Sequence, residues 1–222
     1  SSRRWVQRVW KRQPGGGACG LGGSPSSTMR LARSPAAGVS GNAADSIRGL
    51  WRIATAQGNA SAQALWFKAL LETGQQKFWD WMQRARQQDE AKAYADAGAS
   101  WLQSASRLWT SWCEAAGSFA SAKGHDDEVL SAARKCIAEG VGKQKSEDRL
   151  RLAHYQIAYI LNDRGVYEEA LSHAREASVL DSTDVYSLYE QGKALQGLRR
   201  FQEVVIVVKQ AIRLSDGKHG FH

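Results

Sequence analysis

The chain has 222 residues, a formal net charge of +8 and 43% hydrophobic residues, enough apolar material for a packed core. Its wholly apolar runs, such as Val204–Val208, are far shorter than the roughly 20 residues of a membrane-spanning helix, so the composition excludes one. With only three prolines, we predict an all-α protein in three parts: a tail over residues 1–44, a Trp-rich helical region over 45–122 and helical repeats over 123–222.

The basic charge is concentrated in the tail. Residues 1–44 hold seven of the 30 Lys and Arg residues and no acidic residue, whereas residues 45–222 are almost neutral. A folded body without excess positive charge argues against a DNA-binding surface, so we predict no DNA partner. The Gly- and Ser-rich stretches of the tail predict an extended conformation. Its Arg- and Ser-rich, acid-poor composition is typical of organellar transit peptides. We therefore predict localisation in the mitochondrion, with the chloroplast as the alternative.

The first 13 residues combine cations with apolar side chains. The candidate contact residues of this segment are Arg3, Arg4, Trp5, Arg8 and Trp10. On a helix they form a basic amphipathic face, which suits a membrane surface or RNA. The alternative, favoured for so short a segment, is a tail that is solvated or held by a partner protein.

The middle region holds seven of the nine tryptophans. Apolar residues recur there at three- and four-residue intervals, which predicts helices from about residue 45, over about 61–89 and over about 90–119. Stacking on RNA bases is one use for such tryptophans. We favour packing in the core and at interfaces, because the helical spacing already accounts for most of them.

The three cysteines, Cys19, Cys113 and Cys136, are odd in number and widely spaced. This pattern indicates neither a disulfide framework nor a zinc site. We predict unpaired thiols in a reducing compartment.

Aligning the chain with itself at an offset of 34 residues gives regularly placed matches. The matched pairs are Tyr155 and Tyr189, Ala158 and Gly192, Leu161 and Leu195, Tyr167 and Phe201, Glu169 and Glu203, Ala170 and Val204, Ala177 and Ala211, and Leu180 and Leu214. Small residues stand where two helices must approach closely, and large ones where they fill the gap. The pattern resembles the tetratricopeptide repeat (TPR) family, whose helix–turn–helix unit has this period.

The resemblance covers residues 151–184 and 185–218 and implies a short α-solenoid of two stacked hairpins. There are departures from the family pattern. His154 and Leu188 replace the Trp of the first helix, and Arg199 stands where the first unit has Gly165. An earlier unit is suggested by residues 126–137, which match the second helix of the first unit at an offset of 41. Chance similarity of two Ala-rich helices is the alternative.

In the TPR family the first helix of each unit lines a concave groove. The resemblance therefore implies a partner-binding set consisting of Tyr155, Tyr159, Tyr186, Tyr189 and Lys193. The groove would be aromatic, without the Lys and Asn clamp that chaperone-binding members use for a peptide carboxylate.

The last predicted helix carries more apolar residues than one neighbouring helix can cover. Packing on the preceding helix accounts for Val204, Val205 and Val208, which leaves Ile206 and Val207 surplus. Exposing them would create an unusual apolar patch. We predict that a partner, or the N-terminal part of the chain, covers this face.

Nothing in the sequence indicates catalysis. The Gly-rich stretch near residue 20 lacks the Lys and Ser or Thr of a phosphate-binding loop, and the five histidines show no metal-ligand spacing. We therefore predict a non-enzyme without cofactor or metal. Its expected role is that of a scaffold or accessory subunit of a large organellar complex, of respiratory, ATP-synthase or photosynthetic type. The alternative is an organellar RNA-binding or ribosomal helical-repeat protein.

Overall fold

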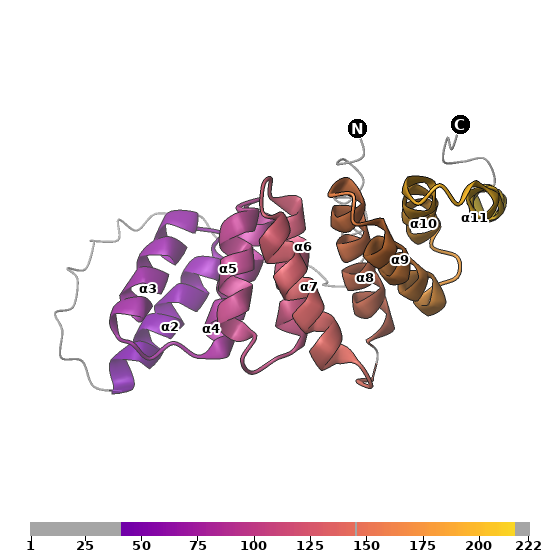
Figure 1. Ribbon diagram of the computed structural model, residues 1–222. Coiled ribbons are helices and arrows are strands. Elements are labelled where there is room, and N and C mark those ends of the chain that lie inside the picture. The colour runs from indigo at the N-terminus through magenta and orange to yellow at the C-terminus, as the bar shows by residue number, and fades with distance from the viewer. Residues whose placement is uncertain (1–40, 145, 216–222) are drawn as a thin grey trace. The chain divides into compact units, whose positions relative to one another are not determined.

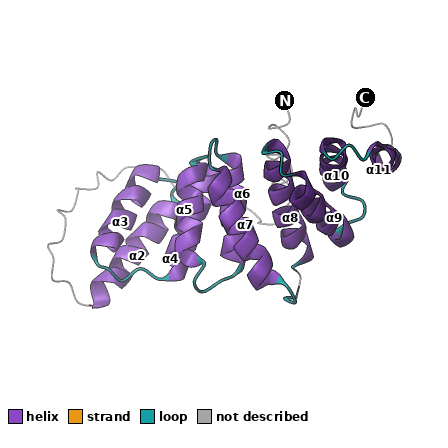
Figure 2. Cartoon of the chain, viewed as in Figure 1, coloured by secondary structure: helices purple, strands orange, loops and turns teal. Residues whose placement is uncertain are grey.

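The computed structural model describes residues 41–144 and 146–215, and every regular element within them is an α-helix. The ten helices of the described residues are α2 (Gly41–Ala56), α3 (Ala60–Glu72), α4 (Phe78–Glu90), α5 (Tyr94–Ser104), α6 (Thr110–Ser121), α7 (Asp126–Gly140), α8 (Glu147–Asp163), α9 (Tyr167–Leu180), α10 (Val185–Gly197) and α11 (Phe201–Ser215). Short loops join them (Figures 1 and 2). The all-α prediction is confirmed.

The helices come in pairs, and the turn between the two helices of each pair contains one residue in the left-handed backbone conformation. These residues are Gly58, Lys92, Gly124, Gly165 and Arg199, with φ between 59° and 77°. Each is followed, two residues later, by the second helix of its pair. Glycine adopts this conformation freely, whereas a side chain costs about 1–2 kcal/mol there. The described chain is therefore a series of five helical hairpins.

The predicted 34-residue register is confirmed in the last two hairpins. The first helices end at Asp163 and Gly197, and the second helices begin at Tyr167 and Phe201. The Val-rich run over residues 204–208 is helical. The α6–α7 hairpin turns in the same way, and its α7 begins 41 residues before α9. Of the seven extra residues, four lengthen α8 relative to α10, two lengthen the connection between α7 and α8, and one lengthens α7 relative to α9.

The two long helices predicted in the middle region are wrong, because each is broken into two. The segment 61–89 ends its first helix at Glu72, and Gly74 then takes a φ of 65°. The segment 90–119 is interrupted after Ser104, whose hydroxyl donates to the Trp101 carbonyl and lies 2.8 Å from the Ser111 hydroxyl. This second break contains neither Gly nor Pro, so the helical spacing of apolar residues continues through it and the sequence does not indicate where the helix ends.

The described residues divide after Gln76 into two compact units. The first contains the α2–α3 hairpin, in which the buried Trp51 ring lies 5.1 Å from that of Phe67. In the second unit, each helix from α4 to α11 packs on the next one, as in a solenoid. Helix α8 also packs on α6 and α10, so these three helices form one layer of the second unit.

Glycines and alanines let the helices of the second unit approach closely. A Cβ atom on Gly98 would lie 2.7 Å from the Phe119 ring, and one on Gly197 only 2.5 Å from the Tyr167 ring. The core alanines on α8 and α9 that are fully buried are Ala158, Ala170, Ala174 and Ala177. Any larger residue at these positions would force neighbouring helices apart.

A disulfide joins Cys113 on α6 to Cys136 on α7, with a Cα–Cα distance of 5.0 Å. The prediction of unpaired thiols is therefore wrong for these two residues. They lie 23 residues apart in sequence, but the hairpin folds their helices side by side. The third cysteine, Cys19, lies outside the described residues.

A pair of histidines joins α8 to α9. The Nδ1 atoms of His154 and His173 are 2.9 Å apart. Burial, and then the charge of His173, lowers the pKa of His154 to about 4. Burial is also the main cause that lowers the pKa of His173. Both imidazoles are therefore neutral at pH 7.

We expect the double substitution Cys113→Ala and Cys136→Ala to lower the free energy of unfolding by about 3 kcal/mol. The bridge joins cysteines 23 residues apart and so reduces the conformational entropy of the unfolded chain. Denaturant titration with and without a reducing agent measures the effect. Reductant should destabilise the wild type and leave the variant unchanged; equal stability of the two oxidised proteins would contradict the prediction.

We expect acid to destabilise the wild type relative to a His154→Leu variant. The folded pKa of about 4 lies below the ordinary 6.5, so the unfolded chain binds more protons between these values. The stability contributed by the neutral histidine is complete above about pH 6.5 and is lost as the pH falls towards 4. Urea denaturation at about pH 7 and pH 4.5 measures the difference, and parallel pH profiles of the two proteins would refute it.

Candidate functional site

The predicted tyrosines of α8 and α10 lie together, and we call Tyr155, Tyr159, Tyr186 and Tyr189 the tyrosine face. The ring of Tyr155 lies 6.4 Å from that of Tyr159 and also 6.4 Å from that of Tyr186. The helical spacing places each pair on one side of its helix, and the packing of α8 on α10 brings the two pairs together. The structure thus assembles this part of the predicted partner-binding set.

The four tyrosines differ in exposure. Tyr155, Tyr159 and Tyr186 are half-buried, whereas Tyr189 is 47% exposed. Burial raises the pKa of Tyr155, with a smaller contribution from the charge of Glu190. Tyr189 is therefore the tyrosine most open to a partner.

Lys193 completes the predicted set and is held over the tyrosines. Its Nζ lies 5.2 Å from the ring centre of Tyr159 and 6.0 Å from that of Tyr189. It also pairs with Asp163 at 3.1 Å and Glu190 at 3.5 Å. Burial lowers the pKa of Lys193, but the two carboxylates outweigh burial, so the pKa lies above its ordinary value. The face therefore presents aromatic rings around one fixed cation.

Glu190 is buried beneath this face and depends on Asn162. The Asn162 amide donates to both the carboxylate and the backbone carbonyl of Glu190, each at 2.9 Å. Burial raises the pKa of Glu190, and the bonds from Asn162 and Lys193 oppose that shift. These polar groups join α8 to α10, a role that the sequence did not indicate.

The predicted apolar face on α11 exists, but its residues differ from the expectation. Ile206 is 66% exposed, as expected. Val207 is half-buried against the core, so its assignment to the exposed face is wrong. Val205 and Val208, expected to be covered by α10, are 51% and 39% exposed. The cause is the orientation of α11, which directs Val204, Val207 and Ala211 inward.

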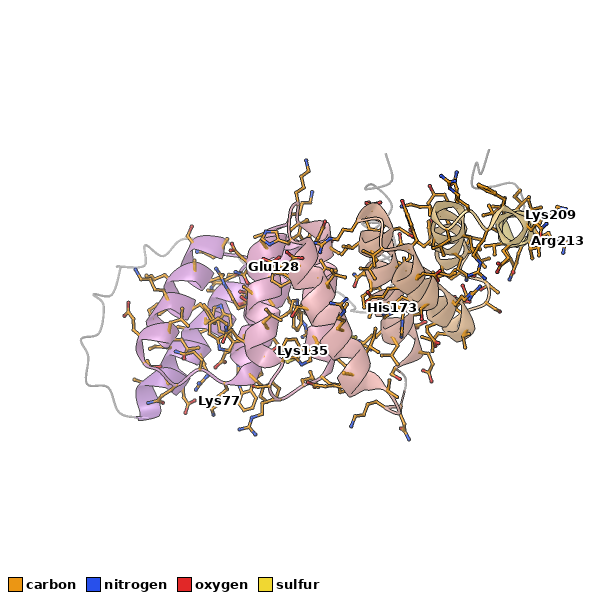
Figure 3. All side chains as sticks on the ribbon, viewed as in Figure 1. Lys77, Glu128, Lys135, His173, Lys209 and Arg213 are labelled. Carbon is orange, nitrogen blue, oxygen red and sulfur yellow. A yellow bond between two sulfur atoms is a disulfide. The ribbon has the colours of Figure 1, made fainter. Side chains whose placement is uncertain are left out.

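Four exposed residues at intervals of four, three and four form one line along α11, and we call them the α11 stripe: Phe201, Val205, Val208 and Ile212. The cations Lys209 and Arg213 lie on the same helix (Figure 3). The 34-residue offset aligns the stripe with residues of α9 that α10 covers, since Leu171 and Ala174 are buried and Ser178 accepts a hydrogen bond from Gln191. No further described helix follows α11 to cover the stripe in the same way.

The remaining predicted contact residues, Arg3, Arg4, Trp5, Arg8 and Trp10, lie outside the described residues.

Several tryptophans of the middle region serve packing, as predicted. Trp101 is buried and donates to Asp89 at 2.9 Å, and Trp112 donates to Glu139 at 3.1 Å. Trp79 is 45% exposed.

Across the described ranges, the helices are too short or too polar for any to span a bilayer. Within the same ranges, no group of three or more His, Cys, Asp or Glu side chains is placed to hold a metal ion.

Comparison with solved structures finds a likeness to one described as the crystal structure of MamA protein. The TM-score is 0.62 at 12% sequence identity, and the match covers 82% of this chain and 97% of that chain. At this identity the likeness establishes the fold, a helical repeat. No protein-family model and no curated protein sequence matches the chain.

We expect Asn162→Ala to destabilise the fold by about 2 kcal/mol, because it leaves the buried carboxylate of Glu190 without its amide donor. Denaturant unfolding measures the loss. The control is Gln196→Ala, at an exposed position on α10, where we expect a change within about 0.5 kcal/mol. Equal effects of the two substitutions would show that the bond to Glu190 contributes nothing.

Proposed function

We propose that the chain is a non-catalytic scaffold of the TPR type, acting as an accessory subunit of a large organellar multiprotein complex. The observation that carries the proposal is a helical-repeat array with two surfaces suited to other proteins: the tyrosine face and the α11 stripe. Tyrosine is enriched at protein interfaces, where its ring supplies area and its hydroxyl a polar contact.

The tyrosine face suits an extended segment of a partner subunit. Its rings offer apolar area at low entropic cost. The charge of Lys193 is already neutralised by Asp163 and Glu190, so the face does not offer it to a further carboxylate. A partner segment with aromatic or apolar side chains and no net negative charge matches this chemistry.

The α11 stripe suits a helix instead. On α9 the equivalent residues are covered by α10, so the stripe presents the surface that a following helix of the array would cover. Lys209 and Arg213 favour acidic residues along the flank of that helix. We propose that a partner subunit supplies it.

The mitochondrion is the proposed location, with the chloroplast as the alternative, and respiratory or ATP-synthase assemblies are proposed before photosynthetic ones. The composition of the tail supports an organellar address. The disulfide between Cys113 and Cys136 favours a compartment in which disulfides persist over a reducing one.

The alternative function is binding of organellar RNA, which the basic tail with its tryptophans favours. Against it, Lys193, the cation that lies over Tyr159 and Tyr189, is paired with the carboxylates of Asp163 and Glu190. These carboxylates repel a phosphate backbone, so the tyrosine face is poorly suited to RNA.

Photo-crosslinking in native organelle extract tests the proposal. A photoreactive amino acid replaces Tyr189 on the tyrosine face or Val205 on the α11 stripe, and the control replaces Val179, an apolar residue of α9 that is 79% exposed. We expect both test positions to give defined protein adducts, identified by mass spectrometry, and the control to give little. Adducts to RNA at Tyr189 would support the alternative function. A monomeric protein without adducts at either position would exclude both surfaces as binding sites.

A further inference from the structure

The histidine pair between α8 and α9 occupies positions where the next hairpin has apolar residues. The 34-residue offset aligns His154 with Leu188, which is buried, and His173 with Val207, which is half-buried. Packing at these positions is therefore satisfied by aliphatic side chains. The two imidazoles instead bring two ring nitrogens together in a partly buried place (Figure 3 labels His173).

In the absence of a metal, the two Nδ1 atoms share a hydrogen bond of 2.9 Å. The same separation is that of two ligands on one metal ion. Metal–imidazole bonds measure about 2.0–2.1 Å. Two such bonds at a right angle place their nitrogens roughly 2.9 Å apart, and the observed distance between the Nδ1 atoms of His154 and His173 is 2.9 Å. Right-angle coordination by nitrogen is typical of Cu(II) and Ni(II), and Cu(II) binds such ligands most tightly among the divalent first-row metals.

Glu169 and Arg134 bear on the proton arrangement of the pair. The Glu169 carboxylate lies 3.9 Å from Nε2 of His173, on the side of the ring away from His154. A carboxylate there favours the tautomer with its proton on Nε2, which leaves the Nδ1 lone pair available. Arg134 donates to the same carboxylate oxygen at 2.9 Å and holds it in place. Glu176, on α9, adds a second negative charge near His173.

We propose that His154 and His173 bind one Cu(II) or Ni(II) ion through their Nδ1 atoms, with water completing the coordination. With the His173 proton on Nε2, the hydrogen bond between the rings requires His154 to donate from Nδ1. On binding, this proton moves from Nδ1 of His154 to its own Nε2 through solvent. Both rings stay neutral, so binding releases no net proton from the pair. The ion then links the two helices of the first 34-residue hairpin. Sequence spacing hides such a site, because its ligands come from two different helices.

Isothermal titration of Cu(II) and of Ni(II) into the full chain tests the proposal. The background carries His125→Ala, His219→Ala, His222→Ala and Cys19→Ser, which removes the other histidines and the cysteine outside the disulfide. We expect one ion per chain, together with a rise in the melting temperature. The electron paramagnetic resonance spectrum of the Cu(II) form should show coupling to two imidazole nitrogens.

The matched variant carries His154→Leu and His173→Val, the residues of the next hairpin, so the packing of α8 on α9 is retained. We expect at least a tenfold loss of affinity in this variant and about a tenfold loss for Glu169→Gln, as for other residues that orient a metal-bound histidine. Undiminished affinity in the double variant, or no binding by the background protein, overturns the proposal. If the double variant does not fold, the single His173→Val variant decides: coupling should fall from two nitrogens to one, and an unchanged spectrum overturns the proposal.

Discussion

Close approach of neighbouring helices through very small residues is the constraint on which the second unit depends. Gly197 accepts the ring of Tyr167 at a distance that no Cβ atom would permit, and Gly98 does the same for Phe119. Because the interior is so closely packed, the side chains that leave the helices at the surface have fixed positions. The geometry of the tyrosine face, the histidine pair and the α11 stripe depends on this close packing of the helices.

Hydrogen bonds between buried polar groups fix how far each helix can slide along its neighbours. Asp89 on α4 accepts hydrogen bonds from Trp101 on α5 and Ser118 on α6, and Glu190 on α10 accepts from Asn162 on α8. Burial raises the pKa of both carboxyl groups. An apolar contact tolerates a small slide of one helix along another, whereas a buried carboxylate that loses its donors does not. These two carboxylates therefore fix the register between the helices that they join more sharply than alanines can.

Sequence periodicity predicted the helical class and the 34-residue register, because both depend on spacing along the chain. The tyrosines that come together were implied by the resemblance to the TPR family, in which the first helix of each unit lines a groove. Periodicity missed the helix break after Ser104, which is made by hydroxyl groups without Gly or Pro. It also missed the disulfide and the partnership of Glu190 with Asn162, since both join residues of different helices. For α11, composition showed a surplus of apolar residues, but the rotation of the helix decided that Val205, and not Val207, faces outward.

The disulfide has a mechanical consequence for the second unit, in which each helix packs on the next. Tension applied to the two ends of such a chain passes through every hairpin in turn, and unravelled hairpins lengthen the chain. The bridge joins Cys113 to Cys136, which are 23 residues apart, and prevents the segment between them from being pulled out. At about 3.5 Å per extended residue, the oxidised chain is therefore about 80 Å shorter at full extension than the reduced chain. The length to which the chain can be stretched thus depends on the redox state of its surroundings.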